Sequence, residues 1–277
     1  MGKKGRKTRK TRKARKTRKT RKKRRRSNIK QIAKRIRIDG ETMKSALKRA
    51  KHIQRDAPPY EPDEWNYPDF RRNPHNCYTY FLNKQDPKLT AKCKETKCQM
   101  RNPLKPQPGY WAYYPRIENK SKYNCDIMVK RMLADNPHLI KTNNMKCPAG
   151  YSSGALTVHP GLTYHYYRQD NDGLWSHKDG ATNAKRLDSD GKYILDPKKA
   201  NRNYPKKHID DGTGKKVQVN YKDFCGYFCV PSNPDLKNWH SGVRIKSGGS
   251  RKRKKRKDKY PDFDGLTAID IEKILTY

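Results

Sequence analysis

The sequence predicts an α+β protein, a small domain of helices and an antiparallel sheet, with basic segments at both ends of the chain. Apolar residues recur at helical spacing in 29–36, 43–53 and 123–135. From Leu156 onward, short alternating segments are separated by turn sequences such as Asn171-Asp172-Gly173. Helices that come early and strands that come late favour α+β over alternating βα units.

Residues 1–26 form a basic segment that contains 18 Lys or Arg and no acidic residue. The triplet Arg-Lys-Thr repeats from Arg6 to Thr20, with Ala14 as the one substitution. Nothing in the segment can build a core, because its apolar side chains are no larger than those of Met1 and Ala14. Since like charges repel, we expect an extended tail that binds a strongly negative partner and releases its counterions.

A second basic run, 251–259, has eight basic residues against Asp258, and the whole chain carries a formal net charge of +41. This balance predicts an acidic partner, either an acidic polymer, with double-stranded DNA favoured, or the acidic surfaces of neighbouring proteins. An anionic membrane is less favoured, because neither run interleaves Trp, Phe or Leu. A localisation signal is the alternative. The residues expected to contact nucleic acid are Lys3, Lys4, Arg6, Lys7, Arg9, Lys10, Arg12, Lys13, Arg21, Lys22, Lys23, Arg24, Arg25, Arg26, Arg251, Lys252, Arg253, Lys254, Lys255 and Arg256.

Residues 27–56 predict two basic amphipathic helices. Ser27 has the character of an N-cap for the first, and Asp39-Gly40 ends it. The second covers the apolar positions of 43–53. Two such helices could form a helix-turn-helix. They could also dock through their apolar faces on the body or on a neighbouring protein, and we favour docking because a third helix is missing.

The body is expected at 60–240, after the stiff sequence Pro58-Pro59-Tyr60-Glu61-Pro62. Residues 76–82 predict a short buried helix or strand, and 123–135 a helix. Strands are expected at 164–168, 174–178, 193–195 and 221–230. A linker and basic run then occupy 241–259, and a docking segment occupies 260–277.

The compartment is predicted from the apolar stretches and the cysteines. No stretch is long and apolar enough to span a membrane, and no apolar region follows the basic start, so we expect neither a membrane protein nor a secreted precursor. The seven cysteines are odd in number and irregularly spaced. Free thiols in a reducing compartment are therefore the default expectation.

Two cysteine pairs offer alternatives to free thiols. Four residues separate Cys93 from Cys98, and three separate Cys225 from Cys229. Structural zinc tolerates both spacings. The second pair, however, sits in a strand-like sequence that would place both thiols on one face, an awkward arrangement for a tetrahedral ion. The other alternative to free thiols is a disulfide that forms after release into an oxidising environment. We expect no metal site and no cofactor.

The candidate catalytic residues are a cysteine that comes early and histidines that come late. Cys77 is expected at the start of a buried helix, where unpaired amides lower a thiol pKa. His165 or His177 could act as its base, oriented by Asp188 or Asp196. This layout resembles papain-like cysteine hydrolases, although a Gly-Ser-Cys-Trp motif is missing. The resemblance implies a thiol peptidase or amidase, and the opposing interpretation is a buried structural cysteine.

A further resemblance concerns the chain as a whole. A triplet-repeated basic tail on a Tyr-rich, Cys-containing body is similar to the basic virion proteins of large double-stranded DNA viruses. It implies a minor capsid or core protein in the virion, assembled in host cytoplasm or nucleus with other capsid proteins. The competing functions are a tail-localised thiol hydrolase and a regulatory protein that binds nucleic acid with base preference.

Overall fold

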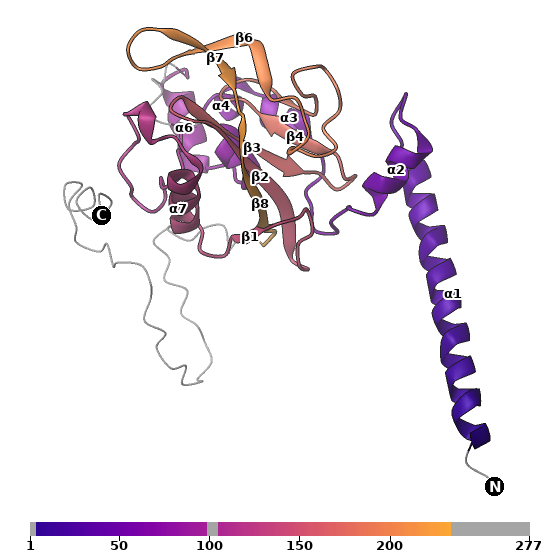
Figure 1. Cartoon of the computed structure of the whole chain (residues 1–277). Coiled ribbons are helices and arrows are strands. Elements are labelled where there is room, and N and C mark those ends of the chain that lie inside the picture. The colour runs from indigo at the N-terminus through magenta and orange to yellow at the C-terminus, as the bar shows by residue number, and fades with distance from the viewer. Residues whose placement is uncertain (1–3, 99–104, 234–277) are drawn as a thin grey trace, which may run out of the picture.

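A computed structural model describes residues 4–98 and 105–233, without the side chains of 4–13, 15 and 16. It confirms the α+β class: helices fill the first half of the chain, and a six-stranded antiparallel sheet follows (Figure 1). A long helix projects away from this body. Lys3, the second basic run and the expected docking segment 260–277 lie outside the described residues.

The N-terminal segment is helical, and the expected extended tail is wrong. A single helix, α1, runs over Lys4–Ile36 and passes through Ser27, which is therefore not an N-cap. Its residues explain this, because Lys, Arg and Ala are all strong helix formers and Thr is tolerated. At 1.5 Å per residue, α1 is about 50 Å long.

The C-terminal end of α1 packs against α2 (Met43–Ala50), which Thr42 caps by accepting a hydrogen bond from the Ser45 amide. Ala33, Ala46 and Ala50 are buried at the centre of this contact. The apolar faces of the two helices therefore cover each other rather than a neighbouring protein. Helix α2 also ends three residues before the expected limit at 53.

Arg49 fastens the helix pair to the body. Its guanidinium donates to the carbonyl oxygens of Ile36 (2.6 Å) and Asp172 (2.8 Å) and pairs with the Glu41 carboxylate at 2.6 Å. The close approach of the Arg49 side chain to the turn at 171–173 needs glycine at position 173. A Cβ there would lie 2.9 Å from the Arg49 Cγ, and φ is +82°. The position of α1 relative to the sheet is therefore set by buried contacts.

The helices of the body are mostly short. α5 (Cys77–Phe81) begins at Asn76, whose side chain accepts hydrogen bonds from the amides of Tyr78 and Thr79. This settles the expected choice between helix and strand at 76–82. α7 (Cys125–Asp135) confirms most of the helix expected at 123–135. The remaining helices are α3 (Pro62–Asn66), α4 (Asp69–Arg72), α6 (Pro87–Glu95) and the 3-10 helix η2 (Lys120–Lys122).

The main sheet has the strand order β1-β8-β2-β3-β4-β5, and the described pairs are antiparallel. The hairpin expected at Asn171-Asp172-Gly173 joins β3 to β4 as predicted. The expected strand 193–195 makes only isolated bridges. The strands are β1 (Ile140–Thr142), β2 (Tyr151–His159), β3 (Thr163–Gln169), β4 (Trp175–Lys178), β5 (Ala184–Lys185) and β8 (Asp223–Pro231), and a separate ribbon pairs β6 (Asn203–Asp210) with β7 (Lys216–Asn220).

One face of the sheet carries the larger core, where α5 and α7 pack against the strands. Figure 1 shows α7 beside the sheet. Phe81, Tyr166 and Phe228 are almost fully buried there. At Gly154 on β2, a Cβ would overlap the ring of Phe81, so the sequence needs glycine at this contact. The opposite face holds a smaller cluster around Trp175 and Tyr167.

Six of the seven cysteines are paired, and the expectation of free thiols is wrong. The bridges are Cys93–Cys98, Cys125–Cys225 and Cys147–Cys229. The expected placement of Cys225 and Cys229 on one face is also wrong. The strand register shifts opposite Leu156 and Thr157, so Cys225 joins the core under α7 while Cys229 bonds Cys147 instead.

Candidate functional site

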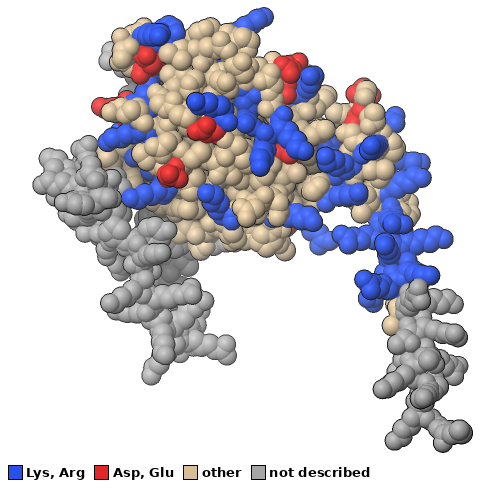
Figure 2. Space-filling view, viewed as in Figure 1, with Lys and Arg blue, Asp and Glu red and all other residues tan. Residues whose placement is uncertain are grey.

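Figure 2 shows Lys and Arg side chains gathered along the described part of α1, where it projects from the body. The side chains of 17–26 are all exposed, and none of the Lys or Arg among them makes a described ion pair. A three-residue repeat advances by about 300° along a helix, so the Thr positions move around the axis and cations point in every direction. Such a rod can contact an acidic polymer from any side.

Cys77 lies at the first turn of α5 as expected, but the environment of its thiol is the opposite of an activating one. The residue is 6% exposed, and burial raises the pKa of the thiol to about 12. No described hydrogen bond joins its Sγ to either imidazole. A protonated, sealed thiol is a poor nucleophile, because the thiolate is the reactive form.

His165 on β3 and His177 on β4 form a buried pair, with 2.7 Å between Nε2 of His165 and Nδ1 of His177. The second imidazole continues to the Leu187 carbonyl oxygen, 3.0 Å from its Nε2. Since that oxygen can only accept, His177 donates from Nε2 and accepts at Nδ1, and His165 donates from Nε2. The Nδ1 of His165 is then unprotonated, and it is buried without a described partner. Two neutral imidazoles satisfy this arrangement.

The histidine pair predicts how stability depends on pH. Burial lowers the pKa of His177 to about 4 and that of His165 well below its usual range. The unfolded chain therefore takes up protons first, at a pKa of about 6.5, and stability falls as the pH drops from there towards 4. Asp135 and Asp170 act in the opposite direction, because burial raises the pKa of each to about 6.

The contribution of the pair is isolated by substitution. We expect the free energy of unfolding of the wild-type chain to fall more steeply between pH 6.5 and 4 than that of His177→Asn, because the variant lacks one titrating imidazole. Urea unfolding at several pH values measures both slopes. Equal slopes would show that the buried histidines do not titrate differently on unfolding.

Neither aspartate expected to orient an imidazole does so. The Asp188 carboxylate accepts the amides of its own turn, including that of Lys192 at 3.0 Å. The Asp196 carboxylate accepts the Tyr227 hydroxyl at 2.5 Å. The orienting contact comes from the Leu187 carbonyl oxygen, which no sequence pattern could single out because every residue carries one. The catalytic assignment stays a prediction, and this geometry does not favour it.

Three charged groups near the histidines were missed from the sequence. The Asp179 carboxylate pairs with the Lys207 ammonium at 2.5 Å. Burial alone would raise the pKa of Asp179, but Lys207 and the nearby imidazoles hold it at about 2. Lys178 is buried, its ammonium donates to three carbonyl oxygens, and burial lowers its pKa to about 7. These contacts join β4 to the ribbon and to the loop before α5.

The part of the chain that the structure describes contains no group of three or more His, Cys, Asp or Glu placed to hold a metal ion. All four thiols of the two pairs considered for zinc, Cys93, Cys98, Cys225 and Cys229, are in disulfides. None of the helices within 4–98 and 105–233 has the length and apolar character of a membrane span.

Comparison with known proteins changes the functional interpretation. The chain is 45% identical over 67 residues to insoluble matrix shell protein 1 of Ruditapes philippinarum. The match covers 24% of this chain and 45% of that relative, so it spans less than half of either protein. No protein-family model matches the chain, and no solved structure matches it.

The similarity corrects the expected identity and location. The predicted virion protein and the papain-like resemblance are contradicted, because the match is to a shell matrix protein. The expected partners stay predictions. The expected location in a virion is contradicted by the same finding. The resemblance failed because basic triplets describe a charge pattern, which unrelated proteins share.

Proposed function

We propose that this chain is a structural component of an insoluble extracellular matrix, in which a disulfide-bonded body displays a cationic helix that binds acidic polymers. The observation that carries the proposal is the 45% identity to an insoluble shell matrix protein.

The cysteine pairing supports an extracellular location independently. Disulfides form and persist in oxidising compartments and are rare where glutathione keeps thiols reduced. Here Cys125–Cys225 ties α7 to β8, and Cys147–Cys229 ties the loop before β2 to the same strand. Two bridges on one central strand suit a protein that must keep its fold outside the cell.

The proposed role of α1 is to hold acidic matrix polymers. Its described Lys and Arg lack intramolecular ion pairs, and like charges at i,i+3 and i,i+4 destabilise an isolated helix. A bound polyanion removes that repulsion and releases counterions, so binding and helix stability favour each other. DNA remains a useful probe for such binding.

This role predicts a change in salt dependence. Replacing the six residues 21–26 by Gln is expected to reduce the slope of log K against log salt for duplex DNA by up to about 5, because each lost phosphate contact removes about 0.9. Fluorescence anisotropy across a salt series measures the slope. An unchanged slope would show that residues 21–26 of α1 do not contact the polymer.

A matched control separates α1 from net charge. Replacing six exposed lysines of the body by Gln removes the same charge and should change the slope by about 1 or less. If the slope fell as much as in the helix variant, binding would depend on the overall charge of the chain and not on α1. The control positions are Lys88, Lys97, Lys122, Lys130, Lys141 and Lys222.

The proposed location is tested in the source tissue. Antibodies against the folded body would follow the chain through cell lysis, detergent extraction and extraction of the insoluble residue with denaturant, with and without a reductant. We expect the chain in the insoluble extracellular fraction. Recovery in the soluble intracellular fraction would contradict the proposal.

A further inference from the structure

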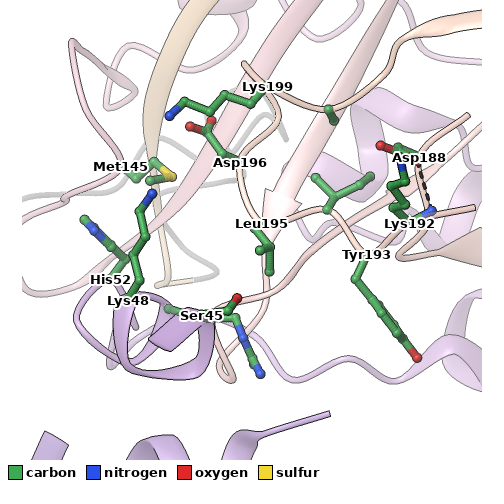
Figure 3. A pocket seen from close by; sticks show the side chains of 14 residues that line it. Ser45, Lys48, His52, Met145, Asp188, Lys192, Tyr193, Leu195, Asp196 and Lys199 are labelled. Carbon is green, nitrogen blue, oxygen red and sulfur yellow. Dashed lines mark hydrogen bonds between the residues drawn. The ribbon is translucent and has the colours of Figure 1, made fainter. Parts of the chain in front are cut away.

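A pocket of about 270 Å³ lies between α2 and the segment 188–200, at the base of the projecting helix (Figure 3). Lys48 and His52 line it from the α2 side, and Lys192, Leu195 and Lys199 line it from the body. Figure 3 shows the side chains of Lys48 and Lys199 directed to the end of the pocket that holds His52 and Met145. The pocket is separate from the buried histidines and from the exposed surface of α1.

The positive side chains of this pocket outnumber its carboxylates, because Lys48, Lys192 and Lys199 line it with only two aspartates, Asp188 and Asp196. The Asp188 carboxylate accepts hydrogen bonds from turn amides, and the Asp196 carboxylate accepts one from the Tyr227 hydroxyl. The ammonium groups of Lys48 and Lys199 make no described ion pair or hydrogen bond. The Nδ1 atom of His52 is buried and has no described partner either. Burial first, then nearby Lys146, Lys48 and Lys51, lower the pKa of His52. The pocket therefore favours an anionic group.

The rim of the pocket has the features of an unpaired strand edge. Along 193–195 the side chains alternate, with Tyr193 46% exposed, Ile194 1% and Leu195 43%. The Ile194 amide donates a hydrogen bond to the Arg186 carbonyl oxygen, and the Ile194 carbonyl oxygen accepts one from the Trp175 amide. The main-chain groups of Tyr193 and Leu195, which point the other way in an extended segment, make no described hydrogen bond. Such an edge can pair with an extended peptide.

We propose that this pocket binds an extended acidic polypeptide, which pairs with the edge at Tyr193 and Leu195 and places carboxylates at Lys48 and Lys199. The main-chain groups at the rim favour a polypeptide over a polysaccharide, since only a polypeptide supplies a regular row of amide donors and acceptors. The exposed Tyr193 and Leu195 side chains add apolar contact to alternate residues of the partner. This site would give the matrix a specific protein contact beside the nonspecific cationic helix, and it does not depend on α1 binding any polymer.

The test measures binding of a labelled decapeptide of alternating Asp and Val to the full chain at physiological salt. The variant Lys48→Glu with Lys199→Glu is compared with Lys22→Glu with Lys23→Glu, which makes the same charge change on α1. All four lysines are exposed, so both variants should fold. We expect the pocket variant to weaken binding at least tenfold and the α1 variant less than threefold. Equal losses would overturn the proposal.

Two further probes identify the kind of ligand. A peptide methylated at alternate amide nitrogens keeps its charge but loses the edge pairing, and we expect it to bind at least tenfold more weakly. Binding equal to that of the unmodified peptide would overturn the edge pairing. A sulfated oligosaccharide of equal charge should respond alike to both double variants. A selective loss in the pocket variant would show a general anion site and overturn the polypeptide assignment.

Discussion

Replacing Cys125 and Cys225 together by Ser is expected to lower the free energy of unfolding by about 3–5 kcal/mol. The bridge joins residues 100 positions apart, so it removes much of the conformational freedom of the unfolded chain. It also fastens α7 to the bulged end of β8, beneath which the larger core lies. Urea unfolding of the oxidised proteins, monitored by Tyr and Trp fluorescence, measures the loss.

The control is Cys93→Ser with Cys98→Ser, which opens a bridge between residues only five positions apart. The same loop-entropy relation gives this bridge about 2 kcal/mol, less than half of the value for the longer loop. We therefore expect a clearly smaller loss of stability. Equal losses in the two variants would contradict the view that the bridges between distant residues hold the body together.

Arg168→Met is expected to lower the free energy of unfolding by about 3–5 kcal/mol, the usual consequence of removing one partner from a buried ion cluster. The Asp170 carboxylate keeps its other partner, Arg186, at 3.1 Å. Arg168 is 2% exposed, and its guanidinium lies 3.4 Å from the Asp170 carboxylate and 3.9 Å from the centre of the Tyr80 ring. It also donates to Asn83 Oδ1 at 2.6 Å, which links β3 to the end of α5. Thermal and urea unfolding measure the effect.

Arg71→Met is the matched control, because Arg71 forms an exposed ion pair with Glu64 at 2.9 Å. Exposed pairs contribute about 0–1 kcal/mol, so this variant should be close to wild type. If the Arg168 variant were as stable as the Arg71 variant, the buried cluster would not be a determinant of the fold.

Local patterns predicted much of the fold. Residues 123–135 and the hairpin at Asn171-Asp172-Gly173 carry their structure in their own spacing and turn residues, and both are confirmed. The ribbon of β6 and β7 was missed, because its sequence is rich in Lys and Asp and its burial pattern is irregular. The helix at 4–26 was not predicted, because repulsion between its like charges favours an extended chain. The high helix propensity of Lys and Arg favours the helix instead.

The candidate site shows which features a sequence cannot supply. His165 and His177 were chosen from the sequence, and they do contact each other. Whether Cys77 is reactive depends on burial, which only the packing of α5 against β3 decides. The disulfide partners also depend on tertiary structure, because a bulge in β8 moves Cys225 to the α7 side. An odd number of cysteines showed only that one thiol was left over.

Mapping the cysteines of the native chain tests most directly whether it is a disulfide-bonded extracellular protein. The chain would be extracted from its source with a thiol-blocking reagent present, then denatured, labelled with a second reagent and analysed by mass spectrometry. We predict the bridges Cys93–Cys98, Cys125–Cys225 and Cys147–Cys229, with Cys77 labelled only after denaturation. Recovery of these six cysteines as free thiols would contradict the account.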